Sequence, residues 1–356
     1  FGAINYSRAN GLYSNCYYDS SKINNPNDSN PPEINPQTTS ELCNLDSSIL
    51  SNWLIDPSRY PLPNIVATDN LEGISKSVWN DILAKVDTSS SGGSGTVTGT
   101  PVSDFSTLQT NIANAHTDGT VTELCLTNDI NMTEYLNIKS GQNIVLKTNG
   151  NYSIYRGSGF TGSFFKVNSG ATFKLGNDDG IYKITLDGRT SSSETEGLSA
   201  SYPFIEQEGT LTVSNCIMQY NKSGGSVLGG AIYSEGTTTI TNTSFMNNAN
   251  TFENTSQGFG GAIYLSNDGN ATISNCTFEN NTTYQRGGAI YIGGSTSNTV
   301  ITVSGSTFKN NIATNSTGKG GAICVSSLYG TVSLTSLTCS ANYVDNATLT
   351  SEDIAY

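Results

Sequence analysis

Charged residues are scarce in this chain, and those present are mostly acidic. Only 13% of the 356 residues are Asp, Glu, Lys or Arg, and 29 acids against 16 bases give a net charge of −13. Nucleic acids and anionic membrane surfaces are bound through clustered Lys and Arg. The composition therefore argues against both as partners. Neutral polar residues fill the space instead, which suits an extracellular surface.

Long apolar runs and metal-binding cysteine spacings are also missing. The sequence has no start methionine, no signal peptide and no apolar run of about eighteen residues. We therefore expect it to be a slice of a longer protein, with any membrane anchor outside it. The 7 cysteines are irregularly spaced and form no C-x-x-C, so neither a disulfide framework nor a zinc site is supported. We predict no metal and no cofactor, and we expect most of the thiols to be small packing residues.

Two short phrases recur through the second half of the chain. Gly-Gly-Ala-Ile, followed by Tyr or Cys, begins at Gly229, Gly260, Gly287 and Gly320. An aromatic-x-x-Asn phrase alternates with it three times, and weaker copies begin at Met218 and Cys339; the strong copies span 245–248, 278–281 and 308–311. The copies recur at intervals of about thirty residues, which indicates a repeat architecture.

The residues within each repeat indicate short strands. Apolar and hydroxyl residues alternate before each aromatic-x-x-Asn, as in Leu211-Thr212-Val213-Ser214, which is typical of a strand with one buried face. No useful helical periodicity occurs within the repeat, so the all-helical repeats are excluded, and leucine is too sparse for a leucine-rich repeat. Two or three short strands per repeat, stacked with equivalent residues in register, predict a parallel β-helix.

The repeat register predicts which residues form columns. Two inward apolar columns are expected: Val213, Ile240, Ile273, Val303 and Leu334; and Ile232, Ile263, Ile290 and Ile323. A column of phenylalanines is expected at Phe245, Phe278 and Phe308. An asparagine ladder is expected where each coil turns, at Asn221, Asn248, Asn281, Asn311 and Asn342. Asparagine tolerates turn conformations and can bond to its equivalents in the neighbouring coils, and the glycine pair permits a tight corner.

Gly-Gly-Ala-Ile alternating with Phe-x-x-Asn resembles the repeats of the polymorphic outer membrane proteins of chlamydiae and their bacterial relatives. The resemblance covers residues 210–342. It implies a right-handed β-helix at a bacterial cell surface, either outer membrane-associated or secreted, usually as an autotransporter passenger or adhesin. No amphipathic barrel strands follow Asn342, so we expect the anchor to lie outside this chain.

The remaining sequence suggests four regions. Residues 1–65 are rich in Pro and Asn and predict an irregular segment. A phrase within it, Ser-Asn-Cys-Tyr-Tyr-Asp from Ser14, is similar to the closing strand of GLUG-type surface repeats, so this segment is interpreted as the end of another repeat region. Residues 66–88 predict a short helix, and 89–100 a Gly/Ser linker. Residues 101–356 predict the β-helix, with an amphipathic cap helix at about 103–116 covering its first coil.

Catalysis is one alternative, because parallel β-helices host pectate lyases and polygalacturonases. Such chemistry needs converging carboxylates, and the candidates are Asp178, Asp179 and Asp187, with Arg189 nearby. Both stretches are also good turn sequences. The lone His116 follows the predicted cap helix, where a surface role is favoured. We predict no catalytic residue.

A second alternative is a glycan- or lattice-binding face of hydroxyls. They flank the central apolar column as a double file: Thr212 and Ser214, Thr239 and Thr241, Thr272 and Ser274, Thr302 and Ser304, Ser333 and Thr335. Thr and Ser are also the default solvent-facing residues of strands. Tyr233, Tyr264 and Tyr291 are expected to stack outward or at a corner. The sequence favours a non-catalytic cell-surface or secreted protein, acting as an adhesin or passenger or as a display stalk, with a host or environmental glycan or protein surface as its partner.

Overall fold

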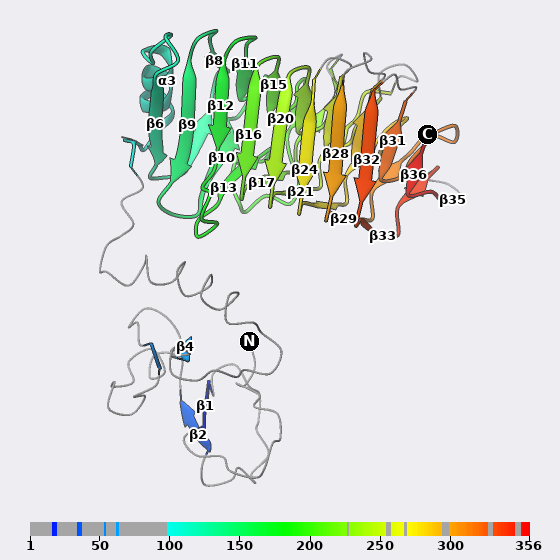
Figure 1. The fold of residues 1–356 in the computed structure, drawn as a ribbon, viewed down its shortest axis with the longest axis horizontal. Helices are drawn as coiled ribbons and strands as arrows, with labels where there is room; N and C mark the ends of the chain where they lie inside the picture. Colours follow the sequence, from blue (N-terminus) through cyan, green and yellow to red (C-terminus); the bar gives the residue numbers. More distant parts are fainter. Residues whose placement is uncertain are drawn as a thin grey trace. The chain divides into compact units, whose positions relative to one another are not determined.

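The structure is a computed structural model, and the chain divides into two units, Phe1–Gly95 and Thr96–Tyr356 (Figure 1). It describes residues 16–19, 34–37, 53–54, 62–63, 98–225, 228–253, 258–266, 269–293, 299–326, 330–345 and 350–356. The predicted helix at 66–88, and most of the segments predicted at 1–65 and 89–100, lie outside the described residues.

The first unit contributes two strand pairs to the described residues. Strand β1 (Cys16–Asp19) pairs in parallel with β2 (Ile34–Gln37). Strand β3 (Trp53–Leu54) pairs antiparallel with β4 (Leu62–Pro63). The Cys-Tyr-Tyr-Asp part of the phrase assigned to a closing strand therefore does form a strand.

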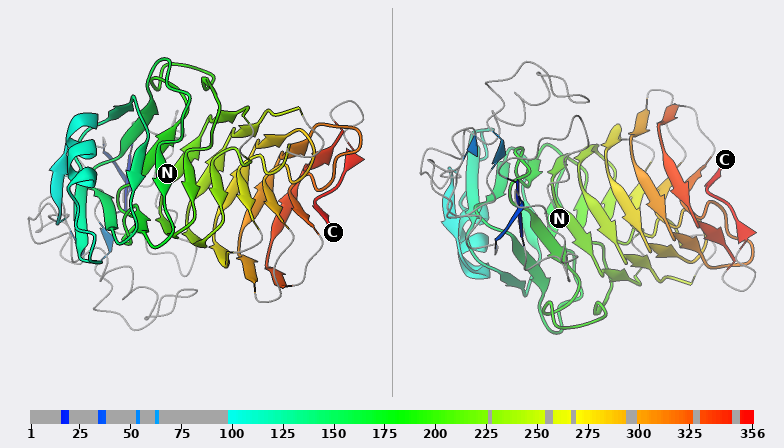
Figure 2. Two further views of the ribbon diagram at one scale, coloured as in Figure 1. Left: turned by 90° about the horizontal axis from the view of Figure 1, so that it is seen from above. Right: turned by 90° about the horizontal axis from the view of Figure 1, so that it is seen from below.

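The second unit is a parallel β-solenoid, as predicted, whose coils stack in register along one axis (Figures 1 and 2). Its described strands form four sheets, numbered 1 to 4 in the order in which the chain visits them within a coil. Every neighbouring pair in these sheets is parallel except β34 and β35, which are antiparallel.

Sheets 1 and 2 carry the alternating runs and the aromatic-x-x-Asn phrases. Sheet 1 has nine strands: β5 (Thr100–Val102), β6 (Val121–Leu126), β9 (Asn143–Thr148), β12 (Thr172–Leu175), β16 (Thr210–Ser214), β20 (Thr237–Thr241), β24 (Ala271–Ser274), β28 (Val300–Ser304) and β32 (Thr331–Thr335). Sheet 2 has eight: β7 (Ile130–Met132), β10 (Tyr152–Arg156), β13 (Ile184–Asp187), β17 (Ile217–Gln219), β21 (Ser244–Met246), β25 (Thr277–Glu279), β29 (Thr307–Lys309) and β33 (Thr338–Ser340).

Sheets 3 and 4 complete each coil. Sheet 3 has seven strands of two residues: β14 (Ser199–Ala200), β18 (Lys222–Ser223), β22 (Ala249–Asn250), β26 (Thr282–Thr283), β30 (Ile312–Ala313), β34 (Tyr343–Val344) and β35 (Thr350–Ser351). Sheet 4, which contains the Ala-Ile-Tyr phrases, has eight: β8 (Leu136–Ile138), β11 (Phe165–Val167), β15 (Ile205–Gln207), β19 (Ile232–Ser234), β23 (Ile263–Leu265), β27 (Ile290–Ile292), β31 (Ile323–Val325) and β36 (Ile354–Ala355).

One apolar core runs the length of the solenoid. The predicted isoleucine column of sheet 4 is fully buried from Ile232 to Ile323, and so is the sheet 1 column from Val213 to Val303. Leu334, in the last described coil of sheet 1, is only partly buried and packs against the same core. Burial of equivalent residues in successive coils holds the repeats in register.

Helix α3 (Phe105–Ala113) caps the first coil, within the range predicted for it (Figure 1). Asp104 caps its N-terminus by accepting a 2.8 Å bond from the amide of Thr107. Its apolar face buries Leu108 and Ile112 in the solenoid core. At its C-terminal end, Nε2 of Gln142 donates to the carbonyl oxygens of Ile112 and Ala115, at 2.9 and 3.1 Å. The helix therefore covers the apolar end of the first coil, and Gln142 supplies donors to carbonyl groups at its C-terminal end.

The corners of the coils are formed by left-handed residues. The prediction that the ladder asparagines themselves adopt the turn conformation is wrong by one residue, because the positive φ belongs to the residue before each of them: Tyr220, Asn247, Asn280, Asn310 and Ala341. A second left-handed column, at the corner between sheets 1 and 2, contains Asn215, Asn242, Asn275, Gly305 and Ser336. The left-handed residue before the ladder can thus be tyrosine, asparagine or alanine, while the next position in each of these five coils is a fully buried asparagine.

The two glycines of each Gly-Gly-Ala phrase serve different purposes. The first is left-handed, with φ of 67° at Gly287, a conformation that costs little for glycine. The second is needed for space, because a Cβ on Gly288 would collide with the carbonyl oxygen of Gly321 and the backbone of Ile312 in the next coil. The pair therefore combines a tight corner with close stacking of neighbouring coils.

Candidate functional site

The ladder asparagines all point into the solenoid and are fully buried. The backbone N–H and the Nδ2 of Asn248 both donate to Oδ1 of Asn281 at 3.1 Å. Asn281 repeats this pattern toward Asn311, and it also donates from Nδ2 to the carbonyl oxygen of Phe245 at 3.0 Å. Each amide thus joins three coils, which gives this column a structural role.

The phenylalanine column lies inward beside the ladder, on sheet 2. Phe245, Phe278 and Phe308 are fully buried, with successive ring centroids 4.8 Å apart and planes within 3° of parallel. This stack and the isoleucine column leave no ladder residue exposed to a ligand. Functional surfaces must therefore be sought on the outer faces of the sheets.

The predicted double file of hydroxyls does lie on one outer face, that of sheet 1. Thr212 pairs with Thr239, Thr239 with Thr272, and the register continues through Thr302 to Ser333. The second file runs alongside, from Ser214 through Thr241, Ser274 and Ser304 to Thr335. Most of these side chains are half-buried by their neighbours in the file, and Ser214 is only 7% exposed.

The acidic candidates do not form a free catalytic pair. Asp178 is exposed and pairs with Lys174 at 2.6 Å, and Asp179 accepts from the amide of Ile181 in a turn. Asp187 is buried, and its carboxylate accepts from Nε and Nη2 of Arg189 at 2.9 and 2.7 Å.

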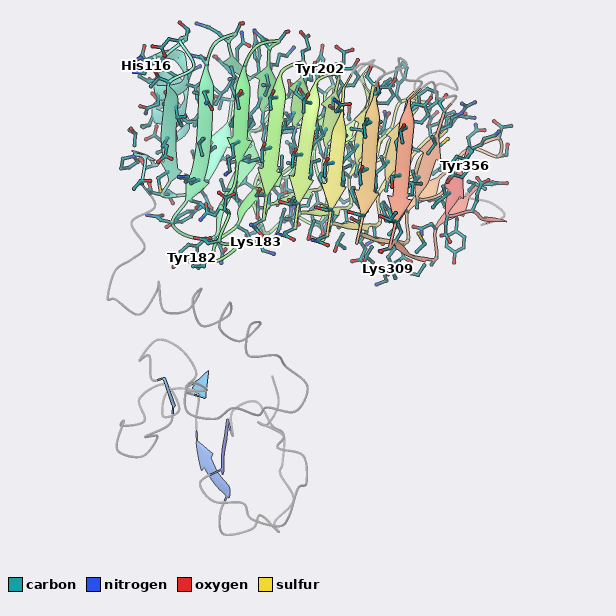
Figure 3. The ribbon with its side chains drawn as sticks, viewed as in Figure 1. His116, Tyr182, Lys183, Tyr202, Lys309 and Tyr356 are labelled. Atoms are coloured by element: carbon teal, nitrogen blue, oxygen red, sulfur yellow. The ribbon has the colours of Figure 1, made fainter. Side chains whose placement is uncertain are left out.

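Further contacts hold the carboxylate of Asp187 and the guanidinium of Arg189 in place. The amide of Gln219 donates to Asp187 at 2.7 Å. The guanidinium of Arg189 lies 4.2 Å from the ring centroid of Tyr220, and its pKa is raised by the bonds to Asp187. His116 is exposed beside the helix-capped end, labelled in Figure 3. Among the described residues no group of three or more His, Cys, Asp or Glu side chains is arranged to hold a metal ion.

The outer face of sheet 4 carries a second column, which the sequence shows only in part. Its central positions are in register from Asn137 through Lys166, Glu206, Tyr233 and Tyr264 to Tyr291. The tyrosines stack outward as predicted, with ring centroids 5.4 and 5.2 Å apart. Phe259 stacks on Tyr291 at 4.5 Å, and the column continues in register from Tyr291 to Cys324.

The polar half of this column is held by specific contacts. The ammonium of Lys166 lies 3.4 Å from Oε1 of Glu206, and 5.3 and 5.5 Å from the ring centroids of Tyr135 and Tyr202. The hydroxyl of Ser163 donates to Glu206 at 2.5 Å. Tyr202 lies along the same edge of the solenoid as His116 (Figure 3). Charged and aromatic groups thus meet where Glu206 adjoins Tyr233.

The hydroxyls of Tyr233 and Tyr264 in this column stay protonated well above neutral pH. Burial raises the pKa of Tyr264 to about 12. Burial also raises the pKa of Tyr233, and so does its hydrogen bond to Glu235. These groups therefore present neutral hydroxyls to any ligand.

A profile of the Chlamydia polymorphic membrane protein repeat matches residues 275–293 and 305–326. Each segment runs from the corner before sheet 2 through the buried asparagine and the glycine pair to sheet 4. These coils are polymorphic membrane protein repeats. The family match implies a location at the outer membrane or the cell surface. No curated protein and no solved structure matches the chain.

Each recurring phrase of the matched repeat therefore has a structural role in the coil. The Phe-x-x-Asn phrase supplies the inward ring and the ladder amide, and Gly-Gly-Ala-Ile supplies the corner and the isoleucine column. None of the described helices is long and apolar enough to span a membrane.

Proposed function

We propose that this chain is a non-catalytic, surface-displayed β-solenoid that acts as an adhesin or as the passenger of an autotransporter. The observation that carries the proposal is the match of its coils to the polymorphic membrane protein repeat. The solenoid offers long outer faces, and irregular connections such as 190–198 project between its short strands. Its partner is a host or environmental glycan or protein surface.

The state of the acidic candidates supports a non-catalytic role. A general acid or nucleophile must be free to reach substrate, whereas Asp187 is buried and bonded to Arg189 and Gln219. Its partners are themselves held in place, since Arg189 also donates to the carbonyl oxygen of Glu194 at 2.8 Å. This arrangement secures the irregular connection after β13.

Attachment of the purified chain to cultured cells and matrix proteins tests the proposal. Beads coated with the full chain should attach saturably, and soluble chain should compete with them; beads coated with heat-unfolded chain serve as the control. The same preparation should release neither reducing ends nor unsaturated products from pectin-type polysaccharides. Turnover that disappears in Asp187→Asn would show a carbohydrate-active enzyme instead, and absence of attachment to every surface would leave the adhesin assignment without support.

A further inference from the structure

The outer column of sheet 4 changes from polar to aromatic between Glu206 and Tyr233, and a hollow lies at that step. The hollow has a volume of about 90 Å³, and its lining includes Tyr233, Glu206, Lys166 and Glu208. Tyr264, in the next coil, stacks on Tyr233 with planes 13° apart. The other lining residues come from preceding coils, so the ring face of Tyr233 opposite Tyr264 borders the hollow.

The ring of Tyr233 is held as a fixed platform. Tyr264 and Tyr291 stack in turn on its far side, and the hydroxyl of Tyr233 donates to Glu235. A platform that is already ordered before binding costs little conformational entropy when a ligand arrives. Further along the column Tyr291 is only 6% exposed, stacks with Phe259 and is followed in register by Cys324, so the accessible end of the stack is at Tyr233.

The rest of the lining is polar and is also positioned. The carboxylate of Glu206 is fixed by Ser163 and Lys166, and its side chain is only 19% exposed. Lys166 supplies N–H donors, while the exposed Glu208 and the half-buried Asn168 add acceptors and an amide at the rim. An aromatic face beside fixed donors and acceptors matches a pyranose, whose C–H face stacks on the ring while its hydroxyls form hydrogen bonds.

The charge of the hollow selects among sugars. Two carboxylates, Glu206 and Glu208, face one ammonium, Lys166, and that ammonium is already paired with Glu206. A uronic or sialic acid would bring a further negative charge to a site that is negative on balance. A neutral sugar meets no such repulsion.

We propose that this hollow is a binding subsite for a neutral pyranose of a surface glycan. The proposal rests on the adhesin function argued above and names its ligand class. The hydroxyl file on sheet 1 is a separate surface and plays no part in it.

Saturation-transfer NMR and a glycan array, both with the full chain, test the subsite. The probes are neutral hexoses, N-acetylhexosamines and short oligosaccharides made from them, with glucuronate and sialyllactose as acidic counterparts. Neutral sugars should bind more tightly than the acidic ones. Tyr233→Ala should weaken binding about tenfold, since an aromatic contact contributes up to about 1.5 kcal/mol, and Glu206→Gln should weaken it through loss of the fixed acceptor and of the Lys166 pairing.

Two variants separate binding from folding. Tyr233→Phe keeps the ring and loses only the Glu235 bond, so it should bind nearly as well as the wild type. Lys309→Ala, on the outer face of sheet 2, where the side chain is 53% exposed, should change nothing. Circular dichroism melts of every variant identify any that misfold.

The outcomes also separate this subsite from the adhesin function. Equal binding by Tyr233→Ala and wild type, a preference for acidic sugars, or no sugar binding at all would each overturn the subsite. If such a result came with beads that still attach to cells, the adhesin function would stand with its site elsewhere. Loss of attachment by the wild-type chain itself would instead remove the function on which the proposal rests.

Discussion

Nη2 of Arg156 donates a 2.7 Å hydrogen bond to Oδ1 of Asn221, the first amide of the asparagine ladder. At the opposite end, Nδ2 of Asn342 donates to Oδ1 of Asp353 at 2.9 Å. Along the ladder, each asparagine donates to Oδ1 of the asparagine in the next coil, and its own Oδ1 accepts from the asparagine in the preceding coil. The acceptor end therefore meets a cation and the donor end meets an anion, which suits the polarity of a chain of aligned amides.

Arg156 is fully buried, and no carboxylate of the described coils forms an ion pair with it. Burial lowers its pKa to about 10, so the guanidinium stays charged at neutral pH. It is held by the carbonyl oxygens of Phe160 and Gly162, at 3.1 and 2.6 Å, and its guanidinium carbon lies 4.9 Å from the ring centroid of Phe164. The guanidinium of Arg156 thus takes the place of the asparagine that would donate to Asn221 from a preceding regular repeat.

The first prediction is that Arg156→Met destabilises the solenoid. It removes the Arg156 donor from three acceptors, of which Oδ1 of Asn221 is fully buried and the carbonyl oxygens of Phe160 and Gly162 are partly buried. Relief of the desolvated charge offsets only part of that cost, for a net loss of about 2 kcal/mol in the free energy of unfolding. The double variant Arg156→Met with Asn221→Leu should cost less than the sum of the single changes, because both partners are then removed. Urea unfolding followed by circular dichroism measures the cycle.

Lys222→Met is the matched control, because Lys222 pairs on the surface with Glu196, which is 77% exposed. Its loss should cost less than about 1 kcal/mol. Equal effects of the two methionine variants would show that Arg156 contributes only as a surface charge does. Additivity in the double variant would show that Arg156 does not act through Asn221.

The second prediction contrasts two adjacent asparagines, Asn281 and Asn280. Asn281→Leu removes the acceptor of both Asn248 donors and the donor to Phe245, and it should cost about 3 kcal/mol or more. Asn280→Gly should be close to neutral, because Asn280 is exposed and left-handed, with φ of 56°. Urea midpoints of the two variants provide the comparison. Similar losses in both would refute the division between buried ladder and exposed corner.

The columns could be predicted because equivalent residues recur at regular offsets, and alternation within each run identifies the inward face. The ends of the ladder could not. Neither Arg156 nor Asp353 has a counterpart at the repeat spacing, and Arg156 lies 65 residues before Asn221 in the sequence. The left-handed residue was misplaced by one position, because asparagine occupies both the corner and the ladder site in three coils, and only backbone geometry separates the two.

The candidate sugar site was missed for a related reason. Tyr233 follows Glu206 at the usual repeat spacing, but the segment between Lys166 and Glu206 is longer and carries irregular turns. The repeat spacing therefore identifies the column only as far back as Tyr233. It does not align the earlier polar residues, Lys166 and Glu206, with the tyrosines. The two-residue strands of sheet 3 also gave no signal, since two residues are too few to show alternation.

The third prediction concerns alkaline pH and Cys216. Burial raises the pKa of its thiol to about 12, against an unfolded value of about 9. A raised folded pKa contributes stability that is fully present below the unfolded value and is lost as the pH rises through it toward the folded value. Wild-type chain should therefore lose more stability between about pH 8 and pH 10 than Cys216→Ala does.

Urea midpoints at the two pH values give the slope, and Cys339→Ala is the control. Cys339 is only partly buried, and burial raises its pKa less far. Its removal should leave the slope nearly unchanged. Iodoacetamide at the lower pH should label Cys216 only after unfolding, as mass spectrometry of digests would show. Parallel slopes for wild type and Cys216→Ala would count against a buried neutral thiol.

The fourth prediction tests the glycine pair. Gly288→Ala should destabilise the solenoid by several kcal/mol, because its Cβ meets backbone atoms of the next coil that cannot move aside without opening the stack. Gly305→Asn is the matched substitution at a left-handed glycine. It places asparagine at the corner where Asn275 already has it, with φ of 56° at Gly305 and 54° at Asn275, so it should cost less than about 1 kcal/mol. Thermal melts of both variants give the two losses of stability. A mild effect of Gly288→Ala would mean that the coils can separate at this position. The close approach of Gly288 to Gly321 would then not be the reason that the repeat requires glycine.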